Sequence, residues 1–539
     1  MLMDQSLWDD TVVGVRPPRP PAGDAVSPQS SKDKRCKRSP TQASAMEGKP
    51  ISAPGERRLL IDGKLVDASS RGRFDNVDPA TEEVLGATAD GTAADMEVAI
   101  AAARRAFDTT TWATDQAFRR QCLHQLQAAL EDEREELRAE LVSEAGCPVL
   151  STYGPQLDAP LREALTWPAD QIDNFPWRRS LGPKDAFGMG VESEREVWKE
   201  PVGVVGVIVP WNFPVEITLN KLGPVLAMGN TCVLKPAPDT PWNATRLGRL
   251  VAERTDIPPG VVNVVASSDH LVGEVLTTSP QVDMVAFTGS TATGRRVMAA
   301  AAETLKPVFL ELGGKSVNLV LDDADFDKVI PGSSAVCFHA GQGCAMPTRL
   351  LVPRSRYDEA VDLAAAGFAG VSYGDPTDPA NLMGPLVSRA QRDRVLGYIA
   401  RGRAEGARLV CGGGVPSHLP TGWYVEPTLF ADVDNAMAIA RDEIFGPVLV
   451  VIPYEDDDDA VRIANDSPYG LSGTISSGDL DRATAVARRI RTGTLGLNGG
   501  LWYGADAPFG GYKQSGVGRQ CGIEGLEIFT ETKTVGWPA

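Results

Sequence analysis

Cys344 is preceded by two glycines, Gly341 and Gly343, and followed by an apolar run at 348–352 that predicts a strand. A thiol attacks an electrophilic carbon only as its thiolate, so catalysis here needs an activating environment, donors for a developing negative charge and a base. His339, five residues earlier, suggests a Cys-His hydrolase, but no third group that would orient this histidine is identifiable. The remaining groups must therefore come from distant parts of the chain.

A repeating alternation of strands and helices begins near residue 203. Apolar strands are predicted at 203–209, 231–234, 262–266, 283–287 and 307–310, with helices such as 242–254 and 294–304 between them. Strands that are apolar throughout and are joined by helices indicate a parallel sheet covered on both faces. The pattern predicts a doubly wound, nucleotide-binding architecture.

Polar and small residues follow four of these strands at their carboxyl ends. Asn212 lies after the first strand, Lys235 after the second, the run 288–291 after the fourth and Glu311 after the fifth. In open α/β sheets the ligand crevice lies outside the carboxyl ends of the strands. These residues are therefore expected to converge, although each type has an ordinary structural role as well, such as turn formation by an asparagine.

A second alternation follows Glu311. Strands are predicted at 317–321, 348–352, 448–452 and 494–497, and helices at 357–368, 391–405 and 480–491. Before residue 203, a capping-box-like start at Thr92 and Asp95 predicts a helix to about 107, and a second helix is expected over 116–144. We therefore predict an α/β protein with two doubly wound parallel-sheet domains, and a substrate cleft between them.

The composition limits the possible partners. A chain of 539 residues with 42% hydrophobic and 23% charged residues can bury a large core. Its net charge of -18 argues against nucleic acid or an anionic membrane as a partner, since both require a basic face. No apolar run approaches the roughly 18 residues of a membrane span, and no secretory signal segment is evident.

The cysteines and the first 55 residues add two further expectations. The eight cysteines are scattered without CxxC pairs or zinc spacing, so we expect reduced thiols, a cytoplasmic location and no metal site. Residues 1–55 are rich in proline and serine and basic at 32–38, which predicts a disordered tail. The acidic run 455–459 indicates a solvated helix start rather than a metal site.

Six short motifs occur in the order and approximate spacing of the aldehyde dehydrogenase superfamily. They are PWNFP at 210–214, FTGST at 287–291, LELGGK at 310–315, GQGC at 341–344, EIFGP at 443–447 and PFGG at 508–511. The resemblance covers about residues 57–539. It implies a dinucleotide-binding domain at 56–182 and 202–312, a catalytic domain at 313–518, and a small β oligomerisation element at 183–201 and 519–539.

The resemblance also implies a catalytic set. Cys344 resembles the nucleophile that attacks the aldehyde, and Asn212 resembles the residue whose side-chain amide stabilises the resulting oxyanion. Glu311 resembles the general base that activates water to hydrolyse the thioester. Because CoA-acylating relatives typically lack this base, the products expected here are a free carboxylic acid and a reduced nicotinamide.

A cofactor-binding set is implied in the same way. The run from Gly289 to Gly294 opens a helix directly after a strand, where free N–H groups and the helix dipole can bind a pyrophosphate. Lys235 resembles the residue that contacts the adenosine ribose, and Glu443 and Phe445 resemble those that hold the nicotinamide ribose and ring. The full expected set is Trp211, Lys235, Gly289, Ser290, Gly294, Gly313, Glu443 and Phe445.

The sequence departs from the family pattern at two positions. Pro238 stands where many NAD-preferring members carry a glutamate that repels a 2′-phosphate, so the cofactor is expected to be NAD with NADP possible. Gln520 stands where the family usually has glutamate. Phe213, Trp502 and Tyr503 occupy positions that border the substrate tunnel in relatives, and they suggest an apolar or aromatic aldehyde.

Two other functions remain open on the sequence alone. A thiol esterase or amidase could use Cys344 and Glu311 without redox chemistry. A non-catalytic binding protein of this fold would be expected to have lost one of these residues, and both are present. We expect a homodimer or a homotetramer, because the stretch 526–535, together with residues near 189–199, resembles the segments that build the intersubunit sheet.

Overall fold

The computed structural model describes residues 55–185 and 187–539, and all structural statements concern these residues. Apart from Gly55, the tail predicted at 1–55 lies outside them. No helix in the described part is long and apolar enough to cross a membrane.

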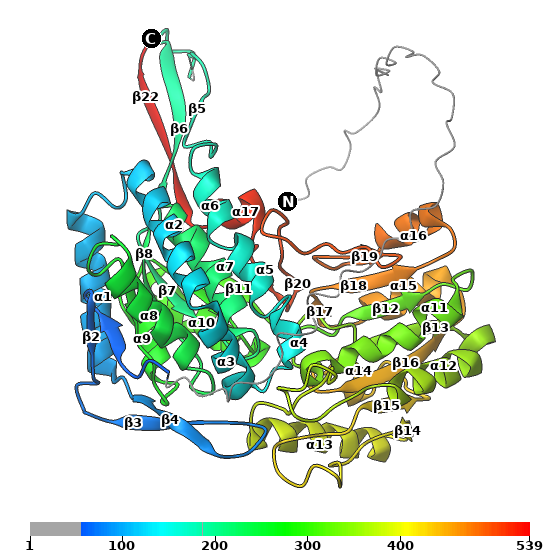
Figure 1. Ribbon diagram of the computed structural model, residues 1–539. Helices are drawn as coiled ribbons and strands as arrows, with labels where there is room; N and C mark the ends of the chain where they lie inside the picture. Colours follow the sequence, from blue (N-terminus) through cyan, green and yellow to red (C-terminus); the bar gives the residue numbers. More distant parts are fainter. Residues whose placement is uncertain (1–54, 186) are drawn as a thin grey trace, which may run out of the picture. The chain divides into compact units, whose positions relative to one another are not determined.

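The first large sheet has eight strands and is parallel at its centre (Figure 1). Strands β9, β8, β7, β10 and β11 run parallel, and β2, β1 and β21 extend the edges in antiparallel pairing. In spatial order the strands are β2 (Lys64–Val66), β1 (Leu59–Ile61), β9 (Val262–Val264), β8 (Thr231–Lys235), β7 (Val204–Ile208), β10 (Met284–Thr288), β11 (Val308–Glu311) and β21 (Gly516–Val517).

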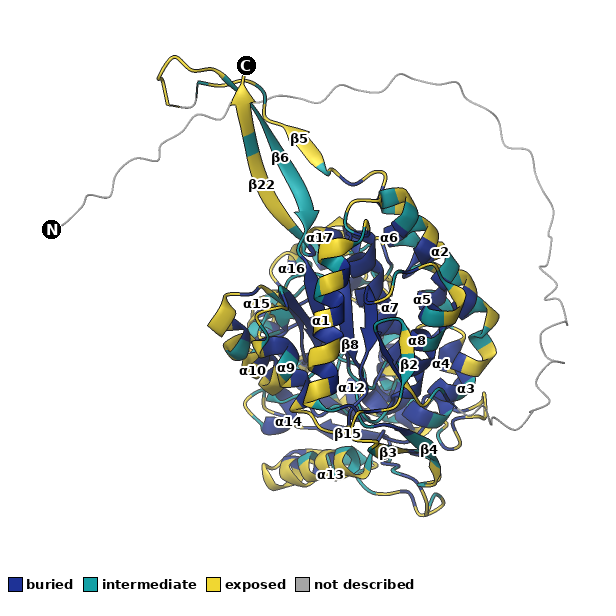
Figure 2. Ribbon diagram, turned by 90° about the vertical axis from the view of Figure 1, so that its left-hand side faces the viewer, coloured by how far each residue is buried: buried dark blue, intermediate teal, exposed yellow. Residues whose placement is uncertain are grey.

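Helices cover both faces of this sheet. Successive residues of a strand point to opposite faces, and apolar residues on both faces of these strands need to be buried. Val204 packs into one hydrophobic cluster, whereas Val205 and Val207 pack into another. One layer contains α1 (Ala93–Thr109), α9 (Val272–Thr278) and α10 (Thr291–Ala301). The other contains α2 (Gln116–Asp132), α3 (Arg134–Ala145), α5 (Asp158–Glu163), α6 (Thr166–Gln171), α7 (Pro214–Ala227) and α8 (Trp242–Arg254). Figure 2 shows β8 buried behind the exposed face of α1.

The second large sheet has seven strands, of which only β14 at one edge is antiparallel to its neighbour. Its order is β14 (Arg408–Cys411), β15 (Thr428–Ala431), β16 (Val448–Tyr454), β13 (Arg349–Pro353), β12 (Val317–Val320), β18 (Gly473–Ser476) and β19 (Gly496–Leu497). Its helices are α11 (Phe326–Val329), α12 (Tyr357–Ala369), α13 (Arg389–Ala404), α14 (Ala438–Arg441), α15 (Asp457–Asn465) and α16 (Leu480–Ala487). The predicted class, α/β with two parallel-sheet units, is confirmed.

Smaller elements complete the fold. A three-stranded antiparallel sheet joins β22 (Thr530–Pro538), β6 (Ser193–Pro201) and β5 (Arg178–Ser180), and it extends away from the helices (Figure 1). Two small two-stranded sheets join β3 (Arg73–Val77) with β4 (Val84–Ala89), and β17 (Tyr469–Gly470) with β20 (Tyr512–Lys513). Short helices are α4 (Val149–Thr152) and α17 (Gly522–Glu527), with 3₁₀ turns at Ala302–Thr304, Pro331–Gly341 and Arg354–Arg356.

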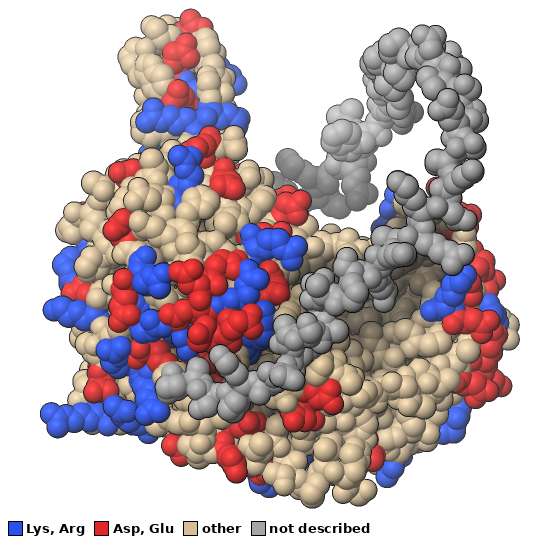
Figure 3. All heavy atoms as spheres, viewed as in Figure 1, with Lys and Arg blue, Asp and Glu red and all other residues tan. Residues whose placement is uncertain are grey.

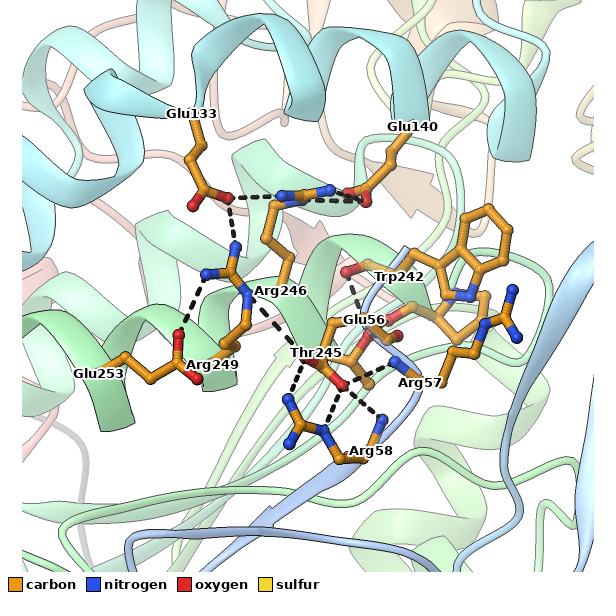
Figure 4. Close-up of polar contacts among 11 residues, drawn as sticks. Glu56, Arg57, Arg58, Glu133, Glu140, Trp242, Thr245, Arg246, Arg249 and Glu253 are labelled. Carbon is orange, nitrogen blue, oxygen red and sulfur yellow. Dashed lines mark hydrogen bonds and ion pairs between the residues drawn. The ribbon is translucent and has the colours of Figure 1, made fainter. Parts of the chain in front are cut away.

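The helix predicted over 116–144 is broken, which corrects the sequence interpretation. Glu133 leaves the helical conformation between α2 and α3, with φ -109° and ψ 26°. Its carboxylate instead accepts hydrogen bonds from Arg246, at 2.5 Å, and from Arg249 (Figure 4). Arg246 also pairs with Glu140 at 2.6 Å, so this ion network joins α3 to α8. The leucine periodicity continues through the break and could not reveal it.

The predicted strand at 526–535 also begins later than expected. Leu526 belongs to α17 and is fully buried in the first hydrophobic core. The strand β22 starts at Thr530 and pairs with β6 along its whole length. Leu526, at the start of the predicted strand, therefore packs as a helical residue.

Candidate active site

Cys344 lies just after a tight bend at the end of the 3₁₀ turn Pro331–Gly341. His339, Ala340 and Gly341 all have positive φ angles, and a side chain on Gly341 would overlap the carbonyl of Gly446. The bend therefore presses the chain against the segment at 446 and fixes Cys344, which is half-buried. Burial raises the pKa of the Cys344 thiol well above its usual range, and the nearby carboxylates add to this effect.

Asn212 follows β7 and is anchored beside the same bend. Its Nδ2 donates to the carbonyl of Gln342 at 2.9 Å, and its own carbonyl accepts from Gln156 at 2.9 Å. His339 Nε2 lies 3.0 Å from that carbonyl, and burial lowers the pKa of His339 to about 4. A neutral His339 that donates from Nε2 thus holds the Asn212 backbone, which accounts for this histidine without a role as a base.

Glu311, at the end of β11, is 2% exposed. Its Oε2 accepts from the hydroxyl of Thr288 at 3.0 Å and lies 3.7 Å from Nζ of Lys221, which is fully buried. Burial raises the pKa of Glu311, while Lys221 and Thr288 oppose that change. A side chain on Gly314, three residues after Glu311, would overlap the carbonyl of Cys344, so Glu311 and Cys344 lie in one site. The charge of Glu311 also raises the pKa of the Cys344 thiol.

The expected cofactor residues lie at the ends of β8 and β10. Lys235 is 4% exposed, and its Nζ has only long contacts, 3.4 and 3.5 Å, to two carbonyls. Burial lowers the pKa of Lys235 to about 8. Ser290 caps α10 by accepting from the backbone of Thr293, and a side chain on Gly294 would meet Leu312. A poorly paired buried ammonium and an open helix start suit a ligand with ribose and phosphate groups.

Other expected cofactor residues lie on the opposite domain. Glu443 accepts from the N–H of Gly314 at 2.9 Å, and a side chain on Gly313 would overlap its carboxylate. Burial raises the pKa of Glu443 to about 7. Trp211 and Phe445 meet edge to face, with ring centroids 5.4 Å apart. The structure therefore brings together residues of five of the six motifs, through the contacts Trp211–Phe445, Asn212–Gln342, Thr288–Glu311 and Glu443–Gly314.

Sequence reasoning missed the polar residues contributed by α7. This helix is buried along its whole length, yet it carries Glu216, Asn220 and Lys221. A spacing of four residues places Glu216 and Asn220 on one face of the helix, and this was the signal that could have identified them. Thr288 lies within the FTGST motif and was not among the predicted site residues, but its hydroxyl donates to Glu311.

A separate hollow of about 560 Å³ is lined by charged residues: Gly55, Glu56, Arg57, Arg58, Asp67, Arg73, Arg246 and Arg249. Figure 4 shows several of these arginines paired with carboxylates. On the face in Figure 3, acidic and basic side chains are likewise interspersed. None of the predicted catalytic or cofactor residues lines the hollow, so we treat it as a structural ion network.

The acidic run and Cys337 have structural roles. Asp456 caps α15 by accepting from the backbone of Asp459 at 2.9 Å. Cys337 lies in the core of the second sheet. Among the residues that the structure describes, no group of three or more His, Cys, Asp or Glu side chains could hold a metal ion.

Comparisons with known proteins agree with this site. The model of the aldehyde dehydrogenase family matches residues 65–535. An aldehyde dehydrogenase structure from Mycobacterium tuberculosis in complex with NAD+ is 42% identical, with a TM-score of 0.86, and the match covers 90% of this chain and 99% of that one. The 3-succinoylsemialdehyde-pyridine dehydrogenase of a Pseudomonas species is 42% identical, over 89% of this chain and 98% of the relative. The chain therefore belongs to the aldehyde dehydrogenase family.

A further relative is the indole-3-acetaldehyde dehydrogenase of Pseudomonas syringae in complex with NAD+ and IAA. It is 38% identical, with a TM-score of 0.85, and the match covers 90% of this chain and 97% of that one. The protein is an NAD(P)-dependent aldehyde dehydrogenase that oxidises aldehydes, and NAD is supported as its cofactor. Nothing in these comparisons favours a cysteine hydrolase.

Proposed function

We propose that Cys344, Asn212 and Glu311 carry out the oxidation. The thiol of Cys344 loses its proton to water and bonds to the aldehyde carbon, and the carbonyl oxygen becomes an oxyanion. The amide of Asn212, held in place by Gln342 and His339, donates to this oxygen. NAD held by the cofactor residues would supply the acceptor for the hydride, and Cys344 retains the acyl group as a thioester.

Glu311 then activates the water that hydrolyses the thioester. Its carboxylate takes a proton from water, the hydroxide attacks the acyl carbon, and the Cys344 thiolate leaves. The product is a free carboxylic acid. The observation that carries this proposal is the convergence of Cys344 with the end of β11. Glu311 ends β11 in the first sheet, Cys344 precedes β13 of the second, and a side chain on Gly314 would overlap the carbonyl of Cys344.

The test is a spectrophotometric assay with a panel of aldehydes and NAD. The native protein should form reduced nicotinamide and a carboxylic acid, and Cys344→Ala should abolish both. Cys411→Ala is a matched control, since Cys411 is a half-buried thiol on β14, outside the proposed site. A Cys344→Ala variant that keeps the native rate would contradict the assignment, and ester hydrolysis without aldehyde oxidation would favour a hydrolase.

The same proposal covers the cofactor residues and the domain boundaries. We infer that Trp211, Lys235, Gly289, Ser290, Gly294, Gly313, Glu443 and Phe445 hold NAD, with the dinucleotide-binding domain at 56–182 and 202–312 and the catalytic domain at 313–518. Support comes from the loose contacts of Lys235 and from the close approach of Glu443 to Gly313.

We also propose that the protein is a homodimer or homotetramer. The supporting feature is the sheet β22-β6-β5, in which β22 is an edge strand of nine largely exposed residues. An unpaired edge of this length favours pairing with another chain. Sedimentation velocity on the native protein and on Thr534→Pro would test this, because proline in β22 should weaken the assembly. A cytoplasmic location fits the free thiols of the described cysteines.

A further inference from the structure

The backbone carbonyl of Asn212 is held by two side chains from different parts of the chain. His339 Nε2 lies 3.0 Å from the carbonyl oxygen, and Gln156 Nε2 donates to the same oxygen at 2.9 Å. Both side chains are fully buried. A carbonyl oxygen has two lone pairs, so the two donors together satisfy its capacity to accept hydrogen bonds. The orientation of this peptide group is therefore fixed by His339 and Gln156.

The side-chain amide of Asn212 is oriented by a third contact. Its Nδ2 carries two hydrogens and donates one of them to the carbonyl of Gln342 at 2.9 Å. Within the described part of the chain Nδ2 makes no other hydrogen bond, so its second hydrogen is available to a ligand. The amide can therefore donate to an oxyanion while it stays anchored, provided that the backbone of Asn212 does not shift.

His339 adopts a backbone conformation that is unfavourable for a residue other than glycine. Its φ angle is 49°, in the left-handed region, and that of the next residue, Ala340, is 54°. The carbonyl of His339 accepts from the backbone N–H of Gln342 and from its side-chain Nε2, both at 3.1 Å. Such conformations persist where the surrounding structure imposes them, and they are frequent at functional sites. The bend that presents Cys344 thus also directs the imidazole toward Asn212.

The contact with Asn212 is the only hydrogen bond of the imidazole among the described residues. Nδ1 of His339 is buried and has no partner there, and the ring packs edge to face against Phe213 with centroids 5.7 Å apart. Because burial lowers the pKa of His339 to about 4, the ring is neutral and carries one hydrogen. The carbonyl that faces Nε2 places this hydrogen on Nε2. The side chain is therefore a single donor aimed at the backbone of Asn212.

We propose that His339 is a positioning residue of the oxyanion site and that it acts jointly with Gln156. It does not touch the aldehyde, but it holds the Asn212 carbonyl so that the free hydrogen of Nδ2 faces the aldehyde oxygen. This inference rests on the proposed roles of Asn212 and Cys344. When either donor is lost, one lone pair of a buried carbonyl is left unpaired and the peptide group can rotate. A displacement of the amide by about 1 Å lowers the rate on the order of 10²-fold.

The test separates stabilisation of the oxyanion from the reactivity of the thiol. Stopped-flow absorbance of a single turnover, with enzyme in excess over aldehyde and saturating NAD, measures the steps up to hydride transfer. Alkylation of Cys344 by iodoacetamide, followed by mass spectrometry, measures the thiol alone, because iodide leaves and no charge develops on a carbonyl oxygen. His339→Leu and Gln156→Leu should each lower the single-turnover rate by about 10- to 100-fold and leave the alkylation rate within about threefold of native.

Two variants serve as controls. His339→Gln places an amide nitrogen near the position of the imidazole Nε2, so it should restore the single-turnover rate to within about fivefold of native. Ser333→Ala changes another buried polar residue of the same 3₁₀ turn, whose hydroxyl has no partner among the described residues. This variant should behave like the native protein in both measurements.

Three results would overturn the inference while aldehyde oxidation still stands. They are a native single-turnover rate in His339→Leu or in Gln156→Leu, an equal loss in His339→Leu and His339→Gln, and a parallel loss of alkylation, which would show a disturbed Cys344 loop instead. If His339→Leu does not fold, Gln156→Leu decides, because Gln156 lies between α4 and α5, outside the bend. Asn212→Ala tests the basis, since a native single-turnover rate in this variant would refute the proposed role of Asn212 itself.

Discussion

The substitution Glu311→Gln separates the two halves of the proposed reaction. Glutamine can accept the hydrogen bond that Thr288 donates to Glu311 at 3.0 Å, so the change removes proton acceptance and largely preserves the packing. The thioester should still form, because no step before hydride transfer uses Glu311. Its hydrolysis should slow by about 10²- to 10⁴-fold, the usual contribution of a general base.

The assay is stopped-flow absorbance of reduced nicotinamide at micromolar enzyme with excess aldehyde. We expect a burst equal to one reduced cofactor per active site, followed by a steady-state rate that is lower by that factor. Glu253→Gln, an exposed residue of α8, should behave like the native protein. An unchanged steady-state rate would remove Glu311 from hydrolysis, and the loss of the burst would place its role before hydride transfer.

Two further predictions concern buried ion pairs. Lys221→Met removes the charge that lowers the pKa of Glu311, so this pKa should rise and the ionised base should be lost at neutral pH. The value of kcat should therefore fall near pH 7 and recover in alkaline solution. A pH profile of kcat that does not shift would contradict the pairing of Lys221 with Glu311. Arg246→Met leaves Glu140 buried without its 2.6 Å partner and should cost about 3–5 kcal/mol in the free energy of unfolding. In urea titrations, the exposed control Arg254→Met should change the free energy of unfolding by no more than about 1 kcal/mol. If Arg246→Met and Arg254→Met lower the free energy of unfolding equally, this prediction is wrong.

The position of the site could be predicted because parallel sheets constrain where residues meet. The carboxyl ends of parallel strands lie at one edge, so β7, β8, β10 and β11 had to deliver Asn212, Lys235, Thr288 and Glu311 to that edge. The resemblance also associated 526–535 with residues near 189–199 in one sheet, and the structure pairs β22 (Thr530–Pro538) with β6 (Ser193–Pro201). The apolar pattern of the strands is sufficient to predict topology of this kind.

Side-chain partners could not be predicted in the same way. Tyr503 and Glu216 are far apart in the sequence and belong to different elements, so no local pattern relates the hydroxyl to the carboxylate. The break at Glu133 is similar, because it depends on Arg246 and Arg249 from another helix. Tertiary contacts of this kind override local helix periodicity.

A tertiary contact also explains Gln520, which stands where the family usually has glutamate and for which the sequence alone indicated no consequence. Its Oε1 lies 3.4 Å from Nζ of Lys221, on which Glu311 also depends. A glutamate at this position would share the charge of Lys221, whereas a neutral amide accepts a hydrogen bond without competing for that charge. Lys221 therefore directs its charge toward Glu311 and opposes the effect of burial on the pKa of this base. The amide thus favours an ionised Glu311 at the pH where the thioester must be hydrolysed.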